Sequence, residues 1–131
     1  MQDKPHYDDV VAEVASFLES RIEACVAAGL REDLIVVDPG FGFGKTTEHN
    51  LQLLRQLPRL IATAYPVMVG VSRKSMIGTI TGRAVADRLA GGLALATYAI
   101  LNGAAVLRVH DVAETRDVVQ IMNAVMRGHQ E

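Results

Sequence analysis

The chain has 131 residues, of which 50% are hydrophobic, and a formal net charge of −2 at pH 7. This length suits one domain over residues 1–131, and the near-neutral charge argues against a protein that mainly binds nucleic acid or an anionic membrane. The single Cys25 excludes an internal disulfide, and the first residues lack the apolar core of a signal peptide, so we expect a cytoplasmic protein. The longest apolar stretch, residues 93–101, is too short to span a membrane.

Residues 7–28 are predicted to form a helix, because their apolar residues recur at helical spacing. Gly29 stands where a helix C-cap belongs, and Cys25 is interpreted as a small buried hydrophobe of this helix. Residues 34–37 (LIVV) are a short run of β-type residues, which predicts a buried strand.

The most informative stretch follows this strand directly, at residues 38–45 (DPGFGFGK). Glycine lets a backbone approach a ligand closely, and a phenylalanine between glycines can flank a flat molecule. Two nucleotide-binding patterns narrowly fail here. A P-loop needs glycine where Pro39 stands, and a dinucleotide loop needs its third glycine where Lys45 stands. Phe41 is left open between core packing and the site.

A second helix is predicted from Thr46 or Thr47 until Pro58 ends it. The apolar residues 67–71 then predict a second strand, which the polar residues 72–75 (SRKS) follow.

A third helix is predicted over residues 86–101 and a third strand over residues 105–109. Asp111 is predicted to be the N-cap of the last helix, which ends near Met126. Glu114, three residues after Asp111, predicts a capping box there.

Helices and continuously apolar strands alternate, which predicts an α/β fold with three parallel strands and flanking helices. Right-handed crossovers place the residues that follow each strand at one edge of the sheet. Polar side chains at residues 38–45, 72–75 and 108–111 should therefore meet, at the edge where α/β proteins bind their ligands. Three strands leave two sheet edges open, so we expect half of a larger barrel, or a half-barrel that relies on a partner.

The chain closely resembles the dihydropteroate synthase family over essentially its whole length. The resemblance rests on residues 38–45 followed by 49–50 (HN), then 70–78 (GVSRKSMIG), 88–91 (RLAG) and 108–111 (RVHD), in this order. It implies the C-terminal half of a (β/α)8 TIM barrel, with the family's N-terminal half absent.

The family enzyme condenses p-aminobenzoate with 6-hydroxymethyl-7,8-dihydropterin pyrophosphate, releases pyrophosphate in folate biosynthesis, uses Mg²⁺ and is the target of sulfonamides. The resemblance therefore implies these small-molecule substrates. It places the protein ligand of Mg²⁺ in the N-terminal half, so this chain supplies no metal ligand. We expect the isolated half to be inactive, and to form a homo-oligomer that covers its open edges.

The resemblance implies that Asp38 and Lys74 bind the pterin. A carboxylate such as Asp38 can accept hydrogen bonds from two ring donors, although it can equally cap the amides of its own loop. Lys74 offers three donors for the opposite edge of the ring. Arg73 should point elsewhere, because successive residues of an extended segment alternate sides.

Arg108 and His110 lie two residues apart and therefore share one side of an extended segment, with Val109 facing away. A guanidinium can bind pyrophosphate with two hydrogen bonds, and a histidine can donate to the same anion. Lys74, Arg108 and His110 are the predicted catalytic residues. The other histidines are interpreted as ordinary side chains.

The remaining substrate-binding residues come from the same motifs. Phe43 resembles the family residue that packs on p-aminobenzoate, and Ser75 resembles the residue near its carboxylate. Gly70 and Val109 complete the substrate-binding set. No nucleophile and base pair is required, because the aniline nitrogen is itself a nucleophile. The predicted work is electrostatic stabilisation of the departing pyrophosphate.

Two alternatives stay open. The chain can be a catalytically silent half-barrel that serves binding or assembly. It can also belong to another pterin-dependent barrel, such as a methyltetrahydrofolate methyltransferase, although methyl transfer leaves no pyrophosphate for residues 72–75 and 108–111 to bind.

Overall fold

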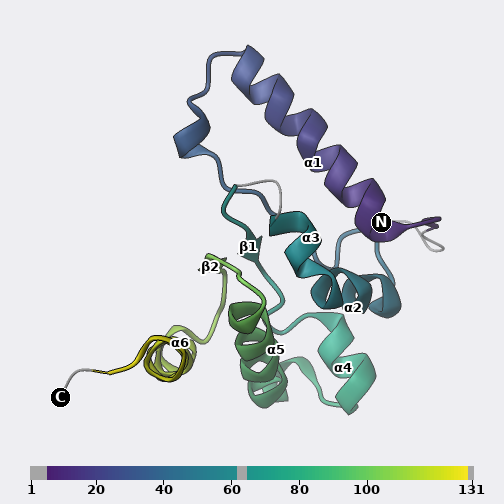
Figure 1. Ribbon diagram of the computed structural model, residues 1–131. Coiled ribbons are helices and arrows are strands. Elements are labelled where there is room, and N and C mark those ends of the chain that lie inside the picture. Colours follow the sequence, from purple (N-terminus) through teal and green to yellow (C-terminus); the bar gives the residue numbers. More distant parts are fainter. Residues whose placement is uncertain (1–5, 62–64, 130–131) are drawn as a thin grey trace.

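The computed structural model describes residues 6–61 and 65–129 (Figure 1). The helices and strands are α1 (Val10–Ala27), α2 (Thr47–Arg55), α3 (Leu57–Ile61), β1 (Met68–Val69), α4 (Ser75–Thr81), α5 (Leu89–Leu101), β2 (Val106–Leu107) and α6 (Val112–Arg127), with single 3-10 turns at η1 (Glu32–Leu34) and η2 (Val85–Asp87). None of the described helices has the length and apolar character needed to cross a membrane.

The strands are parallel, as predicted. β1 pairs with β2 through Met68 opposite Val106 and Val69 opposite Leu107, and an isolated parallel bridge joins Val37 to Val67. The three segments therefore run side by side in one direction, and their carboxyl ends meet at one edge.

The strands are shorter than predicted, and the predicted start of the first strand, at Leu34, was wrong. Leu34 lies in η1 and is 63% exposed, while Val36 is 46% exposed. Ile35 and Val37 on the opposite side are buried. The prediction of a buried strand therefore holds for only one face of residues 34–37, the face of Ile35 and Val37 that joins the core.

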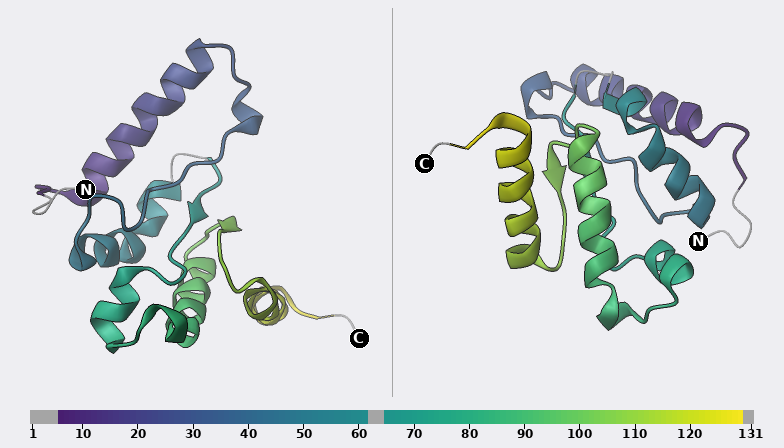
Figure 2. Two further views of the ribbon diagram at one scale, coloured as in Figure 1. Left: turned by 180° about the vertical axis from the view of Figure 1, so that it is seen from behind. Right: turned by 60° about the horizontal axis from the view of Figure 1, so that its bottom comes forward.

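One apolar core lies between the strands and the helices. α1 contacts α2 and α3, α2 contacts α4, and α5 contacts both α4 and α6. Figure 2 shows α5 and α6 side by side with β2 next to them. The largest fully buried side chains come from α1 to α4, from β1 and from the segments beside the strands: Phe41, Leu53, Leu57, Leu60, Met76, Val10, Val11, Val67 and Val69.

The helix boundaries confirm some sequence signals. Gly29 follows α1 with φ +99°, and the Leu30 amide donates to the Cys25 carbonyl at 3.0 Å, as in a Schellman motif. Pro58 does not end helical structure: α2 stops at Arg55, and Pro58 lies in the first turn of α3, where proline needs no amide donor.

The predicted capping box of the last helix was wrong. Asp111 holds the N-cap position of α6, but its side chain accepts no hydrogen bond there, because it pairs with Arg73 instead. A capping box forms at α2, between Thr46 and His49. The third helix likewise begins later than predicted, at Leu89.

The two phenylalanines of the loop after Val37 give a matched test of the core. Phe41 is fully buried, whereas Phe43 is 66% exposed. We expect Phe41→Ala to lower the free energy of unfolding by about 3–5 kcal/mol, because it leaves a cavity. Phe43→Ala should cost about 1 kcal/mol or less. Urea unfolding of both variants measures this, and equal losses would contradict the packing described.

Candidate functional site

The loop at residues 38–45 turns sharply between the strand segment and α2. Gly40, Gly42 and Gly44 all have positive φ, at +75°, +86° and +61°. Side chains other than glycine rarely adopt this conformation, so the glycines fix the path of the loop. Phe41 points into the core from this path, which answers the question left open by the sequence, and Phe43 points outward.

Two side chains outside the predicted site hold this loop in place. The buried Asn50 accepts a hydrogen bond from the Gly42 amide at 2.8 Å and donates to the Thr46 carbonyl at 2.9 Å. Lys45 donates through Nζ to the carbonyls of Gly40 and Phe43, at 2.9 and 3.0 Å. The loop is therefore tied down on both sides of its exposed phenylalanine.

Asp38 caps a backbone amide of the loop and also faces the guanidinium of Arg108. Its Oδ1 accepts from the Gly40 amide at 2.8 Å, and its Oδ2 lies 3.7 Å from Nη2 of Arg108. The carboxylate is half-buried and has lone pairs left for further donors.

Lys74 reaches across the loop from the end of β1. Its Nζ donates to the carbonyl of Phe41 and lies 4.8 Å from the ring centroid of Phe43. A Cβ at Gly42 would meet Cδ of Lys74 at 3.1 Å. Gly42 thus leaves the space that the lysine stem occupies.

Arg108 lies over Gly70 in a similar way. A Cβ at Gly70 would meet Nη2 of Arg108 at 2.8 Å and Nε at 3.0 Å. Any side chain at Gly70 would therefore displace the guanidinium from its place near Asp38. Glycine is therefore needed at position 70 for space, because its backbone φ is not one that requires glycine.

The site is rich in positive charge. Burial lowers the pKa of Lys74, and the nearby Arg108 lowers it further, against the opposing effect of Asp38. Burial also lowers the pKa of Lys45, while Asp38 raises it. Three cations, Lys45, Lys74 and Arg108, thus lie close enough to one carboxylate, Asp38, to interact with it electrostatically. An arrangement with this excess of positive charge favours an anionic ligand.

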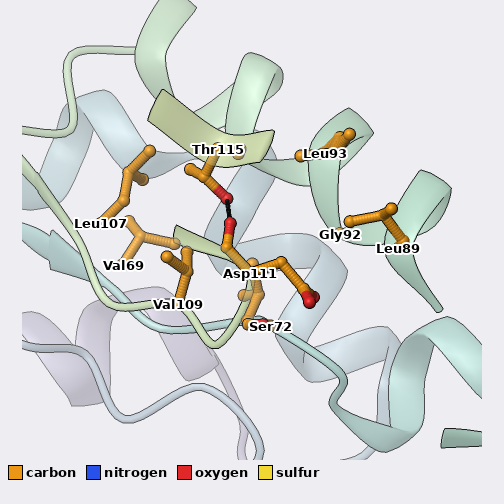
Figure 3. A pocket seen from close by; sticks show the side chains of 11 residues that line it. Val69, Ser72, Leu89, Gly92, Leu93, Leu107, Val109, Asp111 and Thr115 are labelled. Atoms are coloured by element: carbon orange, nitrogen blue, oxygen red, sulfur yellow. Dashed lines mark hydrogen bonds between the residues drawn. The ribbon is translucent and has the colours of Figure 1, made fainter. Parts of the chain in front are cut away.

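The other predicted residues lie around this cluster. His110 contacts Ser72, with Nδ1 3.0 Å from Oγ, while the His110 amide donates to the same oxygen at 3.2 Å. Ser75 is the exposed first residue of α4. Val109 lines a small pocket on the helix side of the strands, so its side chain faces away from Arg108 (Figure 3).

The structure therefore brings together Asp38, Phe43, Gly70, Lys74 and Arg108, but it does not place the Val109 side chain with them. No sequence signal indicates a role for Lys45, because residues 38–45 do not match a P-loop. The signal for Asn50 was present, because it belongs to the motif at residues 49–50, but no role followed from it.

Within residues 6–61 and 65–129, no group of three His, Cys, Asp or Glu side chains lies together as a candidate metal site. Asp38 is the carboxylate of the cluster, and it is already engaged by an amide and a guanidinium. The expected use of Mg²⁺ stays a prediction.

Comparison with known proteins identifies relatives of this chain. A profile of the family described as pterin binding enzyme matches residues 1–110. The dihydropteroate synthase of Neisseria meningitidis serogroup C is 50% identical over 127 residues, which cover 95% of this chain and 45% of that protein. This chain thus spans less than half the length of that relative.

Solved structures that resemble this chain are also dihydropteroate synthases. The Xanthomonas albilineans dihydropteroate synthase with 7,8-dihydropteroate is 51% identical, with a TM-score of 0.92 over 94% of this chain and 47% of that one. The same enzyme has been solved with 4-aminobenzoic acid. The Yersinia pestis enzyme with a sulfonamide drug gives a TM-score of 0.94 at 41% identity over 98% of this chain and 47% of that one. The predicted fold class, part of a TIM barrel, is confirmed.

The ion pair at the ends of β1 and β2 predicts a dependence of stability on acid pH. Arg73 donates from Nη2 to Oδ1 of Asp111 at 2.8 Å, and this bond lowers the pKa of Asp111 below its ordinary 3.8. The stabilising contribution is thus present above pH 3.8 and is lost as the pH falls through the lowered pKa.

We expect Asp111→Asn to flatten the fall of the unfolding midpoint between about pH 4 and pH 2, because the variant has no carboxylate to protonate. Thermal unfolding across this range measures the effect. Asp117→Asn, at an exposed residue of the same helix, is the matched control. An unchanged slope in Asp111→Asn would show that the ion pair contributes nothing to stability.

Proposed function

The chain belongs to the family of pterin-binding enzymes, and from this premise we propose that residues 1–131 carry the C-terminal part of a dihydropteroate synthase site. In this proposal the enzyme joins p-aminobenzoate to 6-hydroxymethyl-7,8-dihydropterin pyrophosphate. The observation that carries the proposal is the cluster of Lys45, Lys74 and Arg108 around Asp38 where the strands end.

The pterin ring is proposed to lie between Asp38 and Lys74. Both its donors and its acceptors then find partners, since Asp38 only accepts hydrogen bonds and Lys74 only donates them. Lys74 uses one donor on the carbonyl of Phe41, which leaves two for a ligand. The lowered pKa of Lys74 agrees with a partly desolvated amine whose charge a ligand acceptor would stabilise.

The second substrate is proposed to pack on Phe43. This side chain is 66% exposed although it is large and apolar, and its ring lies beside the amine of Lys74. The aromatic ring of p-aminobenzoate would cover it and remove apolar surface from water. Ser75 is proposed to hold the carboxylate end, and sulfonamides are proposed to occupy the same place.

The proposed reaction is a displacement at the methylene carbon of the pterin. The amine of p-aminobenzoate forms the new C–N bond, the C–O bond to pyrophosphate breaks with its electron pair leaving on the oxygen, and the amine loses one proton. Negative charge grows on the departing pyrophosphate, and Arg108 and His110 are proposed to stabilise it, since both are donors that follow β2. No covalent intermediate with the protein is needed.

One face of the sheet leaves apolar side chains exposed. Val36, beside the bridge at Val37, is 46% exposed, and Val106 of β2 is 37% exposed, although both are β-branched and apolar. We propose that copies of the isolated chain associate through this face, which covers its apolar side chains and open strand edges. A cytoplasmic location is part of the proposal, since the half-buried Cys25 is a free thiol.

The catalytic proposal can be tested by fusion. We expect a fusion of the N-terminal part of the Xanthomonas albilineans enzyme to this chain to release pyrophosphate when both substrates are present. Arg108→Met should lower its turnover by about 10²–10³, the usual cost of losing one stabilising group. Arg55→Met, which removes an arginine from a surface ion pair, is the control. A folded fusion that releases no pyrophosphate would refute the assignment.

The association proposal is tested by light scattering on the isolated chain. We expect a mass that is a multiple of 14.1 kDa. Val106→Lys should shift the mass toward the monomer by placing a charge on the open face. Val125→Lys, at a 75% exposed residue of α6, should leave it unchanged. A stable monomer of the parent chain would contradict association.

A further inference from the structure

The turn that precedes Lys74 has an unusual backbone. The Lys74 amide donates to the Val71 carbonyl at 3.2 Å, which closes a four-residue turn over residues 71–74. Arg73, the third residue of this turn, has φ +58° and is alone among the described non-glycine residues in having a positive φ. Turns with a positive φ at this place normally use glycine or asparagine, so an arginine here must be held by its surroundings.

Two other side chains hold Arg73. The Asp111 carboxylate accepts hydrogen bonds from two nitrogens of the Arg73 guanidinium, Nη2 at 2.8 Å and Nε at 3.4 Å. Arg88 donates from Nη1 to the carbonyl of Arg73 at 2.9 Å and from Nε to the carbonyl of Arg83 at 3.0 Å. One partner thus fixes the side chain of residue 73 and the other fixes its backbone.

Both partners are themselves anchored. A Cβ at Gly78 would meet Nη2 of Arg88 at 2.1 Å, so the guanidinium fills a space that only glycine leaves open. The carbonyl of Asp111 accepts from Oγ1 of the buried Thr115 at 2.7 Å, which ties Asp111 to the first turn of α6 (Figure 3). The turn is therefore clamped from α4, from the segment before α5 and from the start of α6.

Lys74 lies at the end of this clamped turn. Lys74 follows Arg73 directly, and its carbonyl accepts from the Ile77 amide at 3.0 Å as α4 begins. From this position its amine reaches the carbonyl of Phe41 and the ring of Phe43. If residue 73 relaxed to a negative φ, the chain direction at Lys74 would change and the amine would leave the loop.

We propose that Arg88 and Asp111 are positioning residues that hold residue 73 in the left-handed conformation and thereby aim Lys74 at the ligand. The inference rests on the proposed function only in taking Lys74 as a ligand-binding residue. Arg88 and Asp111 need not contact either substrate.

The test uses NMR on the whole chain without ligand. In Arg88→Met and in Asp111→Asn we expect the Lys74 amide to exchange about tenfold faster with solvent, because the turn opens more often. The ε-methylene protons of Lys74 should lose the ring-current shift that the Phe43 ring imposes. Arg55→Met, which breaks a surface ion pair with Glu48, should change neither signal.

Rescue separates positioning from general stability. Arg73→Gly added to Arg88→Met should restore both Lys74 signals, because glycine adopts a positive φ without help. Arg88→Lys, a milder variant that keeps a donor, should give an intermediate effect if Arg88→Met does not fold. Unchanged Lys74 signals in the folded variants would overturn the proposal, as would equally accelerated exchange at the core residues Leu53 and Leu54. Since no ligand is used, failure here leaves the proposed function untouched.

Discussion

The parallel hydrogen bonds between three short segments are the constraint on which the site depends. The Met68 amide donates to the Val37 carbonyl at 2.8 Å, the Ala105 amide to the Val67 carbonyl at 2.9 Å, and the Arg108 amide to the Val69 carbonyl at 3.0 Å. These bonds bring three loop starts from distant parts of the sequence to one edge. The hydrophobic core behind them keeps the segments in register, and the cations and the carboxylate then meet as a consequence.

Glycines and carbonyls shape this edge as much as the charged groups do. Gly42 and Gly70 leave room for the stems of Lys74 and Arg108, and backbone carbonyls of the loop accept from Lys45 and Lys74. Lys45 and Lys74 are therefore held by neutral carbonyls, and Asp38, paired with Arg108, is the carboxylate beside them. Their positive charge stays available to an anionic ligand, which the proposed departure of pyrophosphate would use.

The sequence predicted the order of elements and which loops meet at the strand ends, because periodicity and glycine placement are local signals. Gly70, Lys74 and Arg108, chosen from their motifs after the strands, do lie at this edge, and their roles stay predictions. The sequence failed where a long-range partner competes with a local one. Asp111 was predicted to cap α6 but binds Arg73, which lies 38 residues earlier. Residues 34–37 were predicted to be a buried strand, but only the side chains of Ile35 and Val37 are covered. Lys45 and Asn50 bind backbone groups of the folded loop, and the spacing of residues in the sequence does not predict such contacts.

The central claim is that the three loop starts form one ligand-binding surface. It is tested most directly by following backbone amide signals of this chain during titration with 6-hydroxymethyl-7,8-dihydropterin pyrophosphate. The account predicts shifts grouped at residues 38–45, 70–75 and 108–110 that saturate together, with the signals of α1 and α6 unchanged. Saturable shifts confined to other residues, or none up to millimolar ligand in a folded chain, would contradict it.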